Sequence, residues 1–135
     1  MVNTEPVSVI VVESQPLMLA ALSTALSVEG MNVIAEVANS RQVVEIAREK
    51  HPRVILFSVG APSLRDLERI SDLRREVPDA LILALTTGEF HAQEQVALES
   101  GAHKVLTKTT PRSELLSAIK MMLQNEVYPA NAQVN

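Results

Sequence analysis

The feature that most constrains the fold is a series of short runs in which nearly every residue is apolar. Such runs occupy residues 7–12, 54–57 and 81–85, with shorter ones at 33–37 and 105–106. Strands that are apolar on both faces are typical of parallel sheets covered by helices on each side. Between the runs, apolar residues recur with helical spacing. The pattern therefore predicts five β-α units, an α/β fold with a doubly wound five-stranded parallel sheet.

Local signals mark where the helices begin. Pro16 suits the first position of a helix, and Gly30 suits the end of that helix. Asn39 or Ser40 is expected to cap the second helix. Ser63 with Asp66, three residues later, resembles a capping box for the third helix.

Composition limits the number of domains and the cellular compartment that we expect for the protein. The chain has 135 residues, enough for one core and too few for two ordinary domains. It has no cysteine, which excludes disulfides and cysteine-bound metal and fits a reducing, cytoplasmic location. We expect a folded domain at 7–123, with tails at 1–6 and 124–135. No signal peptide and no apolar run of the ~18 residues needed to span a membrane is found.

The charge distribution argues against nucleic-acid contact by this chain itself. The net charge is −4, and the basic residues are scattered along the sequence. Binding to phosphates requires clustered lysine and arginine. We therefore expect proteins, not nucleic acid or membrane, to be the direct partners.

Polar residues follow the predicted strands where open α/β sheets place their sites, at the carboxyl ends. The candidates are Glu13 and Ser14 after the first strand, Ser58 at the end of the third, Thr86 at the end of the fourth and Lys108 after the fifth. Ser58 and Ser14 could be small polar fillers, and residues 86–88 could be a plain turn. The set as a whole is more informative than any member.

Four segments in this order resemble the receiver domain of two-component response regulators, most closely the NarL/LuxR-type branch. The resemblance covers residues 7 to about 128. Its motifs V-D-D-H-P-L, P-D-V-V-L-M-D, V-L-T-T and G-A-x-G-Y-L-x-K are matched by VVESQPL at 11–17, PRVILFS at 52–58, ALTT at 84–87 and GAHKVLTK at 101–108.

The resemblance implies a sheet of strand order 2-1-3-4-5 and a role in signal transduction through a phosphorelay. Family members accept a phosphoryl group from a histidine kinase on an aspartate at the end of strand three. Two acidic residues after strand one help that aspartate to hold Mg²⁺. By this resemblance Thr86 and Lys108 would bind the phosphoryl oxygens. It implies no enzymatic activity and no cofactor.

This sequence departs from the family at the site of phosphorylation. Ser58 stands in place of the acceptor aspartate, Glu13 and Ser14 replace the acidic pair, and Val105 replaces an aromatic residue that moves on activation. One carboxylate in the pocket is a poor ligand set for Mg²⁺. A serine without a nearby base is a weak nucleophile, and we expect Glu13 to pair with Lys108. The hypothesis is an atypical receiver that has no catalytic residue and no metal site.

Three alternatives remain open from the sequence. Ser58 could be phosphorylated by an external serine kinase, which would make the chain a switch. The chain could also be a stand-alone receiver, or a flavodoxin-like cofactor protein. The last is less favoured, because residues 13–16 lack the Ser/Thr/Gly-rich character of a phosphate-binding loop.

Aliphatic residues on the first and last helices suggest a contact surface. Leu17 and Leu19 flank the apolar stripe of the first helix, and Leu116 and Leu123 sit at the edge of the stripe of the last. Since these helices are neighbours in the fold, the four leucines predict either a homodimer face or a seam within one chain.

Residues 125–129 resemble the linker that leads, in the NarL/LuxR branch, from the receiver to a helix-turn-helix DNA-binding domain. The chain is then either the regulatory part of a longer transcription regulator or a stand-alone receiver that keeps part of the linker.

Overall fold

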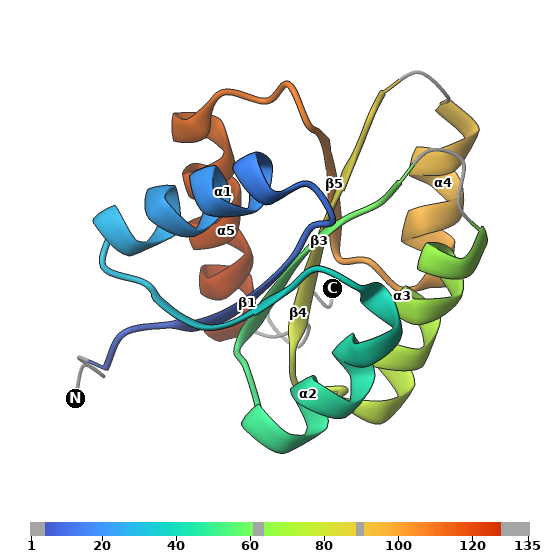
Figure 1. Cartoon of the computed structure of the whole chain (residues 1–135), viewed down its shortest axis with the longest axis horizontal. Helices are drawn as coiled ribbons and strands as arrows, with labels where there is room; N and C mark the ends of the chain where they lie inside the picture. The colour runs from blue at the N-terminus through green and yellow to red at the C-terminus, as the bar shows by residue number, and fades with distance from the viewer. Residues whose placement is uncertain (1–4, 61–63, 89–90, 128–135) are drawn as a thin grey trace, which may run out of the picture.

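The computed structural model describes residues 5–60, 64–88 and 91–127, in which strands and helices alternate along the chain (Figure 1). The fold has the five β-α units predicted from the sequence. The elements are β1 (Ser8–Val12), α1 (Pro16–Val28), β2 (Asn32–Val37), the 3-10 turn η1 (Ser40–Gln42), α2 (Val43–Lys50), β3 (Val54–Ser58), α3 (Leu64–Glu76), β4 (Leu81–Thr86), α4 (His91–Ser100), β5 (Lys104–Thr107) and α5 (Arg112–Val127).

The five strands form one sheet in the order β2-β1-β3-β4-β5, and each neighbouring pair is parallel. This confirms the doubly wound α/β fold and the strand order that the family resemblance implied. The order reverses direction at β1, so the carboxyl ends of β1 and β3 flank the switch point at which such sheets bind ligands.

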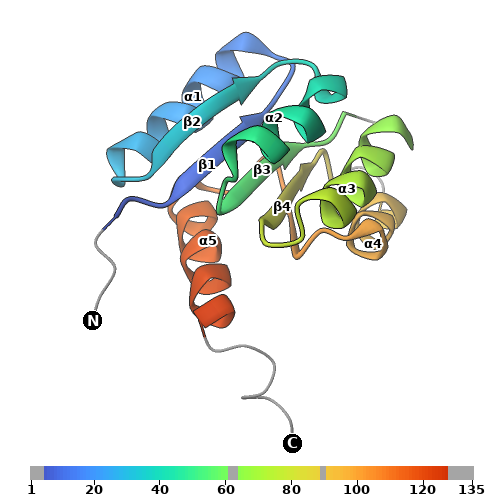
Figure 2. The same ribbon diagram turned by 90° about the horizontal axis from the view of Figure 1, so that it is seen from below.

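Two helical layers cover the sheet. α1 and α5 lie on one face and α2, α3 and α4 on the other (Figures 1 and 2). Successive residues of a strand point to opposite faces. Ile55 and Phe57 therefore join the core under α2, α3 and α4, while Val54 and Leu56 join the core under α1 and α5. This two-sided burial explains why the strand sequences are continuously apolar.

Local chemistry sets the ends of several elements, although the cap expected for the second helix belongs to the 3-10 turn before it. α1 begins at Pro16, and Gly30 follows its end with a φ of +87°. The side chain of Asn39 accepts a hydrogen bond from the N–H of Arg41 at 3.0 Å and so caps η1, which leads into α2. Gly101 closes α4 with a φ of +129°.

The last helix extends beyond residue 123, where the sequence suggested the end of the domain. α5 continues to Val127, while residues 128–135 lie outside the described part of the chain. None of the described helices combines the length and the apolar character required to cross a membrane.

Candidate functional site

The residues predicted at the strand ends lie along one edge of the sheet. Ser58 is the last residue of β3. The N–H of Glu13 donates to the carbonyl oxygen of Val37 at 3.0 Å, and the N–H of Lys108 donates to that of Thr86 at 2.7 Å. These bonds extend the ladders of the sheet by one step, and they fix the backbone from which the site side chains project.

A pocket with a volume of about 310 Å³ opens at this edge and is called here the carboxyl-edge pocket. Three of the five predicted residues line it, namely Ser14, Ser58 and Lys108. Glu13 and Thr86 are each only 2% exposed and are not part of its lining. Its remaining walls come from Val12, Ala38, Asn39, Ser40, Gly60 and Asp66.

Ser58 is buried and chemically unassisted. Its side chain lines the pocket, yet the residue is only 7% exposed, and its Oγ has no hydrogen-bond partner within the described residues. A hydroxyl becomes a useful nucleophile when a neighbouring base takes its proton. No side chain of the described structure bonds Ser58 Oγ in that way, so the arrangement resembles a polar filler more than a nucleophile.

The predicted ion pair between Glu13 and Lys108 is wrong. Glu13 and Lys108 are both described, and they form no salt bridge within 4.0 Å. Glu13 Oε2 instead accepts a hydrogen bond from the N–H of Gln15 at 2.8 Å, while its Oε1 has no partner among the described residues. The carboxylate thus stabilises the turn into α1. Its partner is a backbone N–H only two residues away, so this bond does not require the long Lys108 side chain to be held in one conformation.

Asp66 is the one carboxylate among the described residues that line the carboxyl-edge pocket, and it was not predicted there from the sequence. Its Oδ1 accepts a hydrogen bond from Ser40 Oγ at 2.8 Å, and its Oδ2 accepts one from the N–H of Gly60 at 2.9 Å. The sequence suggested a capping box with Ser63, which lies outside the described residues. The structure shows that Asp66 ties the loop after β2 to the loop after β3. Ser40 and Asp66 are 26 positions apart, so no sequence spacing pointed to this contact.

The donor set does not fit the Mg²⁺ ion that the resemblance implies. That ion requires near-octahedral oxygen ligands and loses its water reluctantly. In the described part of the chain, no group of three or more acidic or histidine side chains could hold a metal ion. Glu13 has one oxygen already bonded, and both oxygens of Asp66 accept hydrogen bonds.

The four leucines of the predicted contact surface do not share one environment. Leu17 is 87% exposed, whereas Leu116 is 6% exposed and belongs to the core between the sheet and α5. Leu19 and Leu123 are partly buried and pack against the same core. The burial of Leu116 fits the alternative of a seam within one chain and not a dimer face, because its side chain packs into the core.

The exposed side of α1 is nevertheless unusual, because it carries no charge. Charged residues are absent from all of α1. After Pro16, its exposed residues form a continuous face, called here the α1 face: Leu17, Ala20, Ala21, Thr24, Ser27 and Val28.

Comparisons with known proteins agree with this fold. Residues 9–120 match the response regulator receiver domain. A nitrate/nitrite response regulator homologue from Haemophilus influenzae is 27% identical over 132 residues, which are 97% of this chain and 64% of that protein. The response regulator GacA of Pseudomonas viridiflava is 27% identical over 123 residues, 90% of this chain and 58% of that protein. This chain thus spans less than two thirds of either relative.

A solved structure resembles this chain over nearly the same share of its length. The structure of a LuxR-family two-component response regulator from Aurantimonas superposes with a TM-score of 0.76 at 24% identity, covering 89% of this chain and 86% of that one. At this identity the likeness supports the fold.

Proposed function

Since the chain belongs to the response regulator receiver domains of two-component systems, we propose that it is an atypical receiver that signals without aspartyl phosphorylation. Domains of this family are signalling modules that act by contacting kinases and other regulators. Here the contact itself would carry the signal, and the partner would be a second copy of the chain or another regulator.

The observation that carries this proposal is the environment of Ser58. The residue occupies the end of β3, where the family has its phosphoacceptor aspartate, and its Oγ has no partner to remove a proton. Exposure of 7% also argues against an external serine kinase, which must bind its target side chain in an extended, accessible segment.

The pocket would be a degenerate remnant of the phosphorylation site. Thr86 and Lys108 keep the positions that bind phosphoryl oxygens in the family, whereas Glu13, Ser14 and Ser58 no longer supply its carboxylates. Without those carboxylates a divalent cation has too few anionic ligands to balance the loss of its water.

Acetyl phosphate tests the proposal directly. We expect incubation with acetyl phosphate and Mg²⁺ to leave the intact mass of the protein unchanged, because neither an acceptor carboxylate nor a full metal site is present. A related receiver that keeps the acceptor aspartate is the positive control. A quantitative mass gain of one phosphoryl group, mapped to Ser58, would refute the proposal.

The α1 face is the proposed self-association surface, in place of the four leucines taken together. An uncharged helix face with Leu17 at 87% exposure is compatible with a two-fold contact, in which the same patch of each copy meets the other. Leu19 and Leu123, which are partly buried and pack against the core, would lie beneath this face.

We also propose that the receiver is the regulatory part of a transcription regulator of the NarL/LuxR type. The support is the resemblance of residues 125–129 to that branch's linker, together with the greater length of the relatives. DNA would then be bound by another domain of the complete protein, since this chain has a net charge of −4. The reading frame beyond Asn135 in the native gene distinguishes this from a stand-alone receiver.

A further inference from the structure

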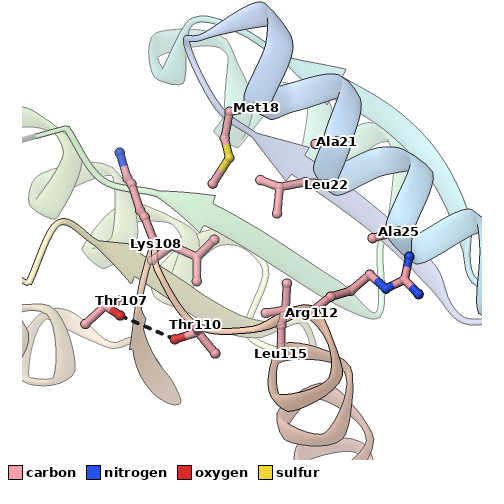
Figure 3. A pocket seen from close by; sticks show the side chains of 10 residues that line it. Met18, Ala21, Leu22, Ala25, Thr107, Lys108, Thr110, Arg112 and Leu115 are labelled. Atoms are coloured by element: carbon pink, nitrogen blue, oxygen red, sulfur yellow. Dashed lines mark hydrogen bonds between the residues drawn. The ribbon is translucent and has the colours of Figure 1, made fainter.

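A second cavity lies between α1 and the segment that leads from β5 into α5 (Figure 3). Its volume is about 180 Å³. We call it the α1–α5 cavity, and its lining includes Met18, Ala21 and Leu22 of α1, Arg112 and Leu115 of α5, and Lys108 from the segment between β5 and α5. It is separate in its lining from the carboxyl-edge pocket, except that Lys108 lines both.

The body of the cavity is apolar. Figure 3 shows Met18 and Leu22 projecting from α1 toward Lys108 and toward Leu115 of α5. An apolar cavity of about 150 Å³ in a protein core is large enough to bind benzene. The α1–α5 cavity therefore has room for a compact apolar group with about six to eight carbon atoms.

One cation borders this apolar space from a half-buried position. The aliphatic chain of Lys108 forms part of the wall, while Arg112 extends toward Ala25 (Figure 3). The ammonium group of Lys108 projects away from Leu22 and Leu115, so the flexible side chain would turn toward the cavity to meet an anion there. Within the described structure, neither Lys108 nor Arg112 takes part in an ion pair. Arg112 is exposed to solvent, where an ion pair contributes little to binding.

From these features we propose that the α1–α5 cavity binds a small carboxylate with an apolar body, and that Lys108 is the cation that holds its carboxylate. Ligand sites combine an apolar lining with a few polar groups that fix orientation, which is the composition found here. A ligand seated in this way would engage the same lysine that borders the carboxyl-edge pocket. The proposal stands on the cavity and does not rest on the loss of phosphorylation.

Benzoate is a suitable probe, with benzyl alcohol as its neutral counterpart. We expect benzoate, added to the chain in increasing amounts, to shift the NMR methyl signals of Met18, Leu22 and Leu115 with a Kd on the order of 1 mM. Benzyl alcohol should bind at least ~5-fold more weakly, because it leaves the ammonium group without an anion.

Two pairs of matched variants locate the site. Lys108→Met should weaken benzoate binding at least ~5-fold and leave benzyl alcohol unchanged, whereas Lys104→Met, an exposed lysine outside the cavity, should alter neither. Ala21→Leu should block binding by filling the cavity mouth. Ala20→Leu, the neighbouring exposed alanine that does not line the cavity, should leave binding intact.

Three results would overturn the proposal. The first is that the methyl signals do not shift at ~20 mM benzoate, a concentration ~20-fold above the expected Kd. The second is that benzoate and benzyl alcohol bind equally well. The third is that Ala21→Leu and Ala20→Leu affect benzoate binding equally. Each can occur whatever the result with acetyl phosphate, so failure here is distinguishable from failure of the proposed function. A far-ultraviolet circular dichroism spectrum identical to that of the unaltered protein shows that each variant is folded.

Discussion

Single residues decide what the carboxyl-edge pocket can bind. Ser58 presents a hydroxyl without a proton acceptor, and Glu13 directs one oxygen to the N–H of Gln15. Asp66 supplies negative charge, but its two oxygens are held by Ser40 and Gly60. The pocket is thus polar and partly anionic, yet it lacks converging free carboxylates.

Restoring those carboxylates should restore metal binding. The double variant Ser14→Asp/Ser58→Asp would place two new carboxylates beside Glu13, and we expect Mg²⁺ binding with a sub-millimolar Kd by calorimetry, against none for the unaltered protein. Ser14→Asn/Ser58→Asn is the matched control, since it adds oxygen ligands of similar size without charge. Sub-millimolar Mg²⁺ binding by the unaltered protein would contradict our account of the pocket.

The bonds of Asp66 should contribute measurably to stability. Asp66→Ala removes the acceptor for Ser40 Oγ and for the N–H of Gly60, and hydrogen bonds to charged groups contribute about 1.5–3 kcal/mol each. We expect the free energy of unfolding, measured in urea, to fall by about 3 kcal/mol or more, the sum for two such bonds. Asp72→Ala on the same helix is the control, and it should cost less because Asp72 forms only surface ion pairs. Equal losses would show that Asp66 does not tie the two loops.

At the scale of elements, the turn from α4 to β5 depends on close packing against α3. Gly101 has a φ of +129°, and a Cβ built there would collide with Arg74 Cγ. The guanidinium of Arg74 also donates to the carbonyl oxygen of Gly101 at 3.2 Å. The glycine therefore meets two requirements at once, a left-handed backbone and a neighbouring helix at short distance.

Gly101→Ala should destabilise the fold by about 1–3 kcal/mol, because it combines backbone strain with a clash that the stem of Arg74 cannot easily avoid. Urea unfolding measures the change. Gly60→Ala is the comparison, since its added Cβ would lie 3.5 Å from Asp66 Oδ2, an ordinary contact. A loss no larger than that of Gly60→Ala would mean that the turn adapts freely.

At the scale of the whole molecule, signalling without phosphorylation, as proposed above, would favour a permanent interface over a switched one. A population shift requires a ligand with different affinity for two states. Val105 also replaces the aromatic residue that moves on activation in the family. The uncharged α1 face is available in this single conformation, so association through it would need no trigger.

Leu17→Glu should separate the proposed dimer, because an unpaired carboxylate buried at an interface costs several kcal/mol. Leu17 is 87% exposed, so the change should leave the fold of the monomer intact. We expect sedimentation at ~100 µM, about 100 times a typical micromolar Kd, to show a dimer for the unaltered protein and a monomer for this variant. Leu98→Glu on α4, at 41% exposure, is the control and should remain dimeric. A monomeric unaltered protein would rule the interface out.

The sequence by itself determined the sheet, the two helical layers and the edge at which polar residues gather. Continuous apolar runs and helical stripes of period 3.6 are local patterns, and burial on both faces of a parallel strand leaves a direct mark on its composition. The serine at position 58, where the family resemblance implies an aspartate, is also visible in one position of one motif.

Only the tertiary structure decided which polar atoms meet. Glu13 bonds the turn into α1 and not Lys108, Asp66 enters the pocket from α3, and Leu116 turns inward. These outcomes depend on the rotation of helices and on side-chain directions across distant segments. The hydrophobic pattern of a sequence is set by burial, which averages over many positions, whereas a hydrogen bond depends on the placement of two particular atoms to within a few tenths of an ångström.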